Sequence, residues 1–89
     1  MDMAFRAKPR VLIIDDDAEY LDVVKRYLVE DYIVYTAQGG RAALDLLMQQ
    51  KVDLILLDVE MPVLDGFHTL ESIRKMETAI DVPVIFVTG

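Results

Sequence analysis

Four short apolar runs divide the chain into predicted strands. They cover residues 11–14, 32–36, 52–57 and 84–87, and most of their members are Val, Ile or Leu. Short apolar runs without strict alternation are typical of strands in a parallel sheet, where helices cover both faces.

Three segments between these runs carry apolar residues at helical spacing and predict helices over residues 18–30, 41–50 and 66–77. Asp17 precedes the first segment and is the expected N-cap. The side chains expected to face inward are Tyr20, Leu21, Val24, Tyr27 and Leu28 in the first helix, Ala43, Leu46 and Leu47 in the second, and Phe67, Leu70, Ile73 and Met76 in the third.

The order of these elements is β-α-β-α-β-α-β with short connections. Such an order predicts an α/β fold with a doubly wound parallel sheet, right-handed crossovers and helices on both faces. We expect one domain over residues 10–89, preceded by a lead-in of residues 1–9 that has no apolar periodicity.

Acidic residues and one hydroxyl follow three of the predicted strands. Asp15 and Asp16 follow the first strand, Asp58 the third and Thr88 the fourth. Because ligands of open parallel sheets bind beyond the carboxyl ends of the strands, we expect these four residues to share one rim. A stiff turn comes after Asp58, since Pro62 restricts the backbone and Gly66 permits conformations closed to other residues.

Carboxylates gathered at such a rim repel one another, by roughly 1 kcal/mol for a pair about 4 Å apart in water. A divalent cation would offset this repulsion, and hard oxygen ligands favour Mg²⁺, with Mn²⁺ possible. Asp58 could then serve as a nucleophile toward a phosphoryl group. The alternative from the residues alone is that Asp58 only ends its strand and caps the next segment of the chain.

Composition narrows the classes of partner. The net charge of −7 argues against nucleic-acid binding by this chain, because that binding depends on clustered Lys and Arg. The chain has no cysteine, which excludes disulfides and thiolate metal sites and is compatible with the cytoplasm. No apolar run approaches the roughly 20 residues needed to cross a bilayer, so we expect no membrane insertion.

Three segments resemble the receiver domain of two-component response regulators. Residues 11–16 (VLIIDD) resemble its first strand and acidic pair, residues 56–66 (LLDVEMPVLDG) its phosphoacceptor strand and loop, and residues 83–89 (PVIFVTG) its fourth strand. The resemblance runs over nearly the whole chain and implies a flavodoxin-like receiver fold with strand order 2-1-3-4.

The resemblance also implies a function and a set of residues. Asp58 would accept a phosphoryl group from a histidine kinase or phosphotransfer protein, and Thr88 would hydrogen-bond it. Asp15, Asp16, Asp58 and the backbone carbonyl of Glu60 would hold Mg²⁺. The module would be no enzyme beyond autocatalytic phosphoryl transfer and autodephosphorylation.

The resemblance stops after the fourth strand. The fifth strand and last two helices of the family, with a lysine that pairs with the phosphoryl group, have no counterpart in the 89 residues. We therefore expect the fourth strand to present a bare edge, and a bare edge is a template for pairing. The chain is expected to form homo-oligomers through this edge or through exposed helix faces.

Two alternatives remain beside phosphorylation. The chain could be a truncated receiver that acts as a self-association or interaction module without phosphorylation. It could also be a Mg²⁺-dependent phosphohydrolase, but Asp58-Val59-Glu60 lacks the second aspartate that such enzymes use as acid and base. His68 is expected to be a surface or partly packed residue, and Asp53 and Asp65 to be a strand entry and a turn residue.

Overall fold

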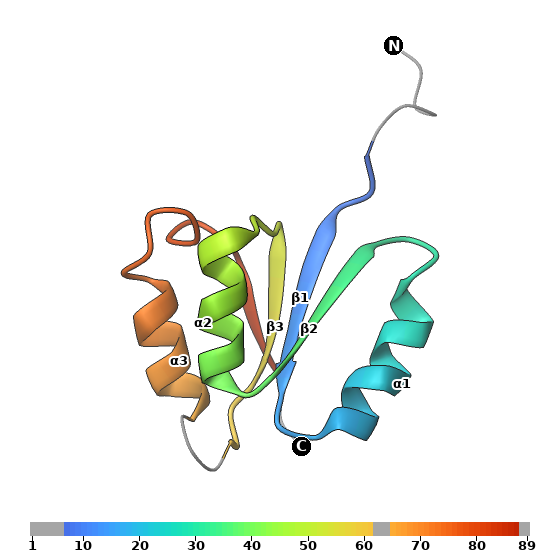
Figure 1. The fold of residues 1–89 in the computed structure, drawn as a ribbon, viewed down its shortest axis with the longest axis horizontal. Helices are drawn as coiled ribbons and strands as arrows, with labels where there is room; N and C mark the ends of the chain where they lie inside the picture. The colour runs from blue at the N-terminus through green and yellow to red at the C-terminus, as the bar shows by residue number, and fades with distance from the viewer. Residues whose placement is uncertain (1–6, 62–64, 88–89) are drawn as a thin grey trace.

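The computed structural model describes residues 7–61 and 65–87 and shows four strands and three helices (Figure 1). Their bounds are β1 Arg10–Asp15, α1 Ala18–Leu28, β2 Ile33–Gln38, α2 Gly40–Gln49, β3 Leu54–Asp58, α3 Gly66–Ile73 and β4 Val84–Val87. The predicted element order is confirmed. The predicted lead-in of residues 1–9 stays a prediction, because residues 1–6 lie outside the described part.

The strands form one parallel sheet in the order β2-β1-β3-β4, so the predicted fold class and strand order are confirmed. β1 lies between β2 and β3, where Ile14 is level with Ala37 on one side and with Leu57 on the other. The chain therefore places β2 on one side of β1 and then crosses to the other side of β1, where β3 and β4 follow.

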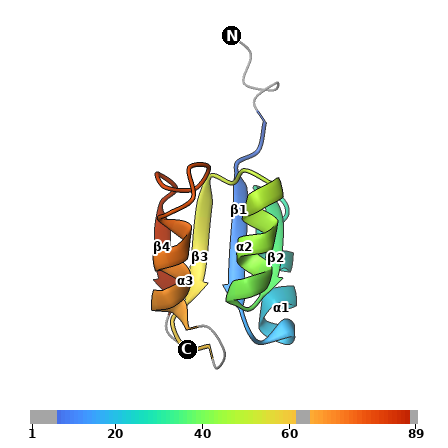
Figure 2. The same cartoon turned by 60° about the vertical axis from the view of Figure 1, so that its left-hand side comes forward.

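The helices lie on both faces of the sheet, with α2 and α3 on one face and α1 on the other (Figures 1 and 2). The rings of Phe86 in β4 and Phe67 in α3 have centroids 5.3 Å apart, so Phe86 points toward the α2 and α3 face. Leu57 is level with Phe86 and Ile14 with Leu57, and level residues in neighbouring strands point to the same face. These three side chains therefore lie under α2 and α3.

The main hydrophobic core lies between the sheet and these two helices. Its fully buried side chains from the strands are Leu12, Ile14, Ile55 and Leu57, and α2 and α3 add Ala43, Leu47 and Ile73. The inward positions predicted for the second helix are confirmed, with Leu46 packing at the margin of the core.

The first and third helices are shorter than predicted and bury fewer of their apolar residues. Tyr27 is 80% exposed and Phe67 64% exposed, so their predicted inward positions are wrong, while Leu21 and Ile73 are buried as predicted. A helix that covers a sheet buries only a narrow stripe, and the flanks of that stripe stay open to solvent. In α3 the fully buried Thr69 takes an inward position that apolar periodicity did not assign.

The third helix ends at Ile73, four residues before its predicted end. The next residue, Arg74, donates from Nη1 to the backbone oxygens of Ala79, Ile80 and Val82, at 3.2, 2.9 and 2.8 Å. One guanidinium thus satisfies three carbonyls of the turns that lead into β4. These turns replace the last predicted helical turn because Arg74 and the buried Ala79 hold them against the core.

β4 forms one border of the sheet. Within residues 7–61 and 65–87, no strand pairs with its other side, and Ile85 is 52% exposed. None of the three helices in the same residues is long and apolar enough to cross a membrane.

Candidate functional site

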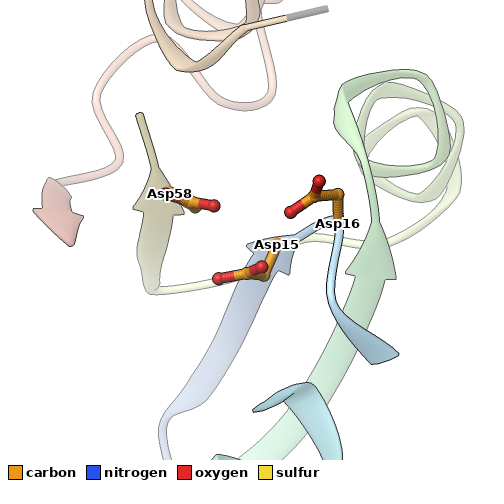
Figure 3. A group of neighbouring side chains, drawn as sticks. All are labelled: Asp15, Asp16 and Asp58. Carbon is orange, nitrogen blue, oxygen red and sulfur yellow. The ribbon is translucent and has the colours of Figure 1, made fainter. Parts of the chain in front are cut away.

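Three aspartates meet at the carboxyl end of the sheet. Asp15 ends β1, Asp58 ends β3, and Asp16 begins the loop that leads into α1. Each offers a carboxylate oxygen, and these oxygens all lie within 4.8 Å of one another. Figure 3 shows the three side chains pointing toward a common space. The predicted convergence of Asp15, Asp16 and Asp58 is therefore seen in the structure.

The sheet register brings Asp15 and Asp58 together. Ile14 is level with Leu57, so the next residue of each strand lies at the same height. Because side chains alternate along a strand, both aspartates point to the face opposite the main core, the face on which α1 lies. Both carboxylates are almost buried, whereas Asp16 is exposed.

Backbone groups hold one oxygen of each buried carboxylate. Asp15 Oδ1 accepts a hydrogen bond from the N–H of Asp17 at 2.9 Å, and Asp58 Oδ1 accepts one from the N–H of Glu60 at 3.0 Å. Among the described residues, Oδ2 of each aspartate accepts no hydrogen bond from a backbone N–H. The N–H groups of Asp17 and Glu60 therefore fix the orientation of the two carboxylates.

The electrostatics of the cluster favour a positively charged ligand. Burial raises the pKa of Asp15 above its ordinary value, and the nearby Asp58 and Asp16 raise it further. The hydrogen bond from the Asp17 N–H lowers this pKa but does not cancel the rise. Asp15 therefore binds a proton more readily than an isolated aspartate does, and a bound cation would relieve the same repulsion. All three side chains offer hard carboxylate oxygens, a set that suits Mg²⁺ and not thiolate-seeking metals.

Some predicted site residues are not settled by this geometry. Thr88 lies outside the described residues, although Val59 donates to the carbonyl of Val87 at 3.4 Å, which brings the end of β4 to the same rim. Glu60 is next to the cluster and is exposed, and the role of its backbone carbonyl stays a prediction.

Two other acidic residues, Asp17 and Asp53, have the structural roles that the sequence suggested, whereas Asp65 was expected to be a turn residue and instead caps a helix. Asp17 is the N-cap of α1 and accepts from the N–H groups of Glu19 and Tyr20. Asp53 lies at the opposite end of the sheet and accepts from the N–H of Arg10 at 2.7 Å. Asp65 is the N-cap of α3, and His68 Nδ1 lies 3.1 Å from its carboxylate on the surface.

Sequence reasoning missed the groups that hold the cluster in place. The N–H groups of Asp17 and Glu60 donate hydrogen bonds to the carboxylates of Asp15 and Asp58, two residues earlier in each case. This spacing is that of an Asx-turn and can be seen in the sequence. The side chain of Gln38 donates from Nε2 to the carbonyl of Asp16 at 3.1 Å, a contact between the end of β2 and the loop before α1 that no local pattern signals.

Comparisons with known proteins agree with this geometry. Residues 11–89 match the family model described as the response regulator receiver domain. The chain is 40% identical over 82 residues to the DNA-binding dual master transcriptional regulator RpaA of Synechocystis, an alignment that covers 91% of this chain and 34% of RpaA. The chain thus spans about a third of the length of this curated relative.

Two solved structures are similar over most of the chain. The chemotaxis protein CheY4 of Vibrio cholerae has a TM-score of 0.86 and 32% identity, over 90% of this chain and 68% of that one. The response regulator TrrA of Thermotoga maritima, solved in complex with Mg²⁺-BeF, has a TM-score of 0.80 and 33% identity, over 90% of this chain and 69% of that one.

Proposed function

The chain belongs to the response regulator receiver domain family, and we propose that it is a two-component signalling module that takes a phosphoryl group on Asp58 in the presence of Mg²⁺. One observation carries the proposal. Three carboxylates from two strands and a loop converge within 4.8 Å, and one of them stands at the start of the loop that resembles the phosphoacceptor loop.

Each acidic residue has a separate task in this proposal. Asp15 and Asp16 would hold the cation together with Asp58 and the backbone carbonyl of Glu60. Mg²⁺, or Mn²⁺ in its place, would supply neutralisation of the charge on the carboxylates and on the phosphoryl oxygens.

Asp58 is the nucleophile. Its Oδ1 is held by the Glu60 N–H, which leaves Oδ2 to attack the phosphorus of a phosphohistidine on a partner kinase or phosphotransfer protein. The new O–P bond forms as the P–N bond breaks, and the electron pair returns to the imidazole. Thr88, one residue past β4, would donate a hydrogen bond to the phosphoryl group.

The module acts on no substrate other than its own phosphoryl group in this proposal, and autodephosphorylation would reset it. We place the module in the cytoplasm, with which the absence of cysteine is compatible. The alignment covers 34% of RpaA, which is named as a DNA-binding regulator, so the proposal extends to the receiver part of such proteins and not to their DNA binding.

The test is intact-mass spectrometry after incubation with acetyl phosphate. The wild type is expected to gain one phosphoryl group when Mg²⁺ is present and none when EDTA removes it, and Asp58→Asn is expected to gain none. Asp81→Asn is the matched control, because Asp81 is exposed just before β4, at the opposite end of the sheet from Asp58. A mass gain retained by Asp58→Asn would refute the proposal.

A second candidate, self-association without phosphorylation, is favoured by the exposed border strand. Ile85 is 52% exposed and Phe86 38% exposed, and no strand of the described part of the chain pairs with the outer side of β4, whose backbone groups could pair with a second copy. Sedimentation should then detect dimers in the micromolar range that Ile85→Lys dissociates. A monomer throughout that range would remove this candidate and leave the phosphorylation proposal untouched.

A further inference from the structure

Gly66, the first residue of α3, makes a very close approach to the phosphoacceptor backbone. A Cβ atom built on Gly66 would lie 2.6 Å from the carbonyl oxygen of Asp58 and 2.6 Å from Cα of Val59. Both are backbone atoms at the end of β3, so no side-chain rotation relieves the contact. Gly66 also donates its N–H to the carbonyl of Val59 at 3.3 Å.

The end of β3 has little freedom to move away from this contact. Asp58 is paired with Val87 of β4, and Leu57, the residue before it, is paired with Ile14 of β1. The peptide between Asp58 and Val59 also precedes the N–H of Glu60 that holds Asp58 Oδ1. A shift of this peptide would therefore turn the Asp58 carboxylate relative to Asp15 and Asp16.

The first turn of α3 is equally constrained. Asp65 caps it by accepting from the N–H of His68 at 2.9 Å, and the fully buried Thr69 and Ile73 anchor the helix on the sheet. The neighbouring Phe67 ring contacts Phe86 of β4. The end of β3 and the first turn of α3 are therefore both fixed, and they are in close contact at Gly66, which has no side chain.

We propose that Gly66 is a positioning residue: its missing side chain lets α3 seat against the Asp58–Val59 peptide and so orients the Asp58 carboxylate toward the cation site. The metal and phosphoryl consequences rest on the function proposed above, whereas the orientation of the Asp58–Glu60 backbone does not. Gly39 is the glycine with a positive φ among the described residues, so the requirement for glycine at position 66 is the contact and not the backbone conformation.

The substitution Gly66→Ala separates this role from a merely structural one. Alanine favours a helix more than glycine does, so without the contact the variant would be at least as stable as the wild type. We expect instead that metal-free Gly66→Ala shows displaced amide NMR resonances at Val59 and Glu60. We also expect Mg²⁺ binding to weaken by roughly 10- to 100-fold, as for residues that orient metal ligands.

His68→Ala is the matched control, since it alters the same helical turn at an exposed side chain without adding an atom near Asp58. It should leave the Val59 and Glu60 resonances and the Mg²⁺ affinity unchanged. Should Gly66→Ala not fold, Asp65→Ala releases the same turn without creating the contact, and it should displace the Glu60 amide resonance of the metal-free protein.

The outcomes are distinguishable. A folded Gly66→Ala protein with wild-type Val59 and Glu60 resonances overturns the inference, as does an unfolded Gly66→Ala protein together with an unchanged Glu60 resonance in Asp65→Ala. If the wild type binds no Mg²⁺, the proposed function fails, while the metal-free amide comparison still decides the role of Gly66.

Discussion

The two faces of the sheet are built from the same kind of apolar residue but are covered very differently. Under α2 and α3, the residues of the central strands are fully buried in one cluster, as Ile55 and Leu57 show. On the other face, α1 lies over β1 and β2, and Val11 and Ile13 of β1 are buried there, so the cover is incomplete only at β3 and β4. Leu54 and Leu56 of β3 are only half-buried there, and Ile85 of β4 is 52% exposed.

The face that carries the acidic site is therefore not the face that carries the main core. The rows of side chains on the α1 face end in Asp15 and Asp58, so the carboxylates stand on the less covered face, where an ion and a phosphodonor can reach them. The face under α2 and α3 carries the close-packed core that holds β1 and β3 in register. We therefore expect substitutions of β3 residues on the core face to change stability more than substitutions of Leu54 or Leu56, and substitutions of Asp15 or Asp58 to change the site.

The largest expected effect comes from the core face. Leu57→Ala should lower the free energy of unfolding by about 2–5 kcal/mol, because Leu57 is fully buried and its truncation leaves a cavity. Leu56→Ala, the adjacent residue on the half-covered face, should cost clearly less. Urea unfolding of the two variants checks the difference, and equal losses would show that the two faces are packed alike.

A smaller effect is expected at the start of α1. Asp17→Ala removes the carboxylate that accepts from the N–H groups of Glu19 and Tyr20 and should cost about 1 kcal/mol of stability. Asp17→Asn is the control, since asparagine caps a helix about as well. If Asp17→Asn were as destabilising as Asp17→Ala, the charge of Asp17 and not its capping would be the stabilising feature.

The smallest effect, and one of opposite sign, is expected at Asp15. Its pKa in the folded protein lies above the ordinary value of 3.8, so between these two pKa values the folded state binds more protons than the unfolded state. The metal-free protein should therefore lose stability as the pH rises from about 4 through the folded pKa.

Asp15→Asn should remove this loss and leave the metal-free protein more stable than the wild type at pH 7. Urea unfolding at a series of pH values, with EDTA present, measures how the free energy of unfolding of the wild type and of Asp15→Asn depends on pH. A wild type whose stability rises with pH over that window, in parallel with the variant, would contradict the raised pKa.

The sequence predicted the sheet and the acidic cluster because both depend on local signals. Apolar runs mark the strands, and Asp15 and Asp58 each stand directly after one. The exposure of Tyr27 and Phe67 was not predictable, because helical spacing gives a face but not the width of the stripe that a neighbour covers. The end of α3 at Ile73 depends on Arg74 reaching carbonyls up to eight residues away.

The role of Thr88 and of the Glu60 carbonyl came only from the resemblance and stays a prediction. The contact of Gly66 with the Asp58–Val59 peptide was beyond sequence reasoning for another reason. A loop that contains Pro62 and Gly66 indicates a turn, but which backbone atoms meet depends on how α3 packs on the sheet.

The most direct test of the acidic site is the effect of Mg²⁺ on the free energy of unfolding. At a concentration 100 times its dissociation constant, Mg²⁺ should stabilise the wild type by roughly 2.7 kcal/mol. The double variant Asp15→Asn/Asp16→Asn should show almost no stabilisation, because it lacks two of the three carboxylates. Equal stabilisation of both proteins, or none of the wild type, would contradict a cation site shared by Asp15, Asp16 and Asp58.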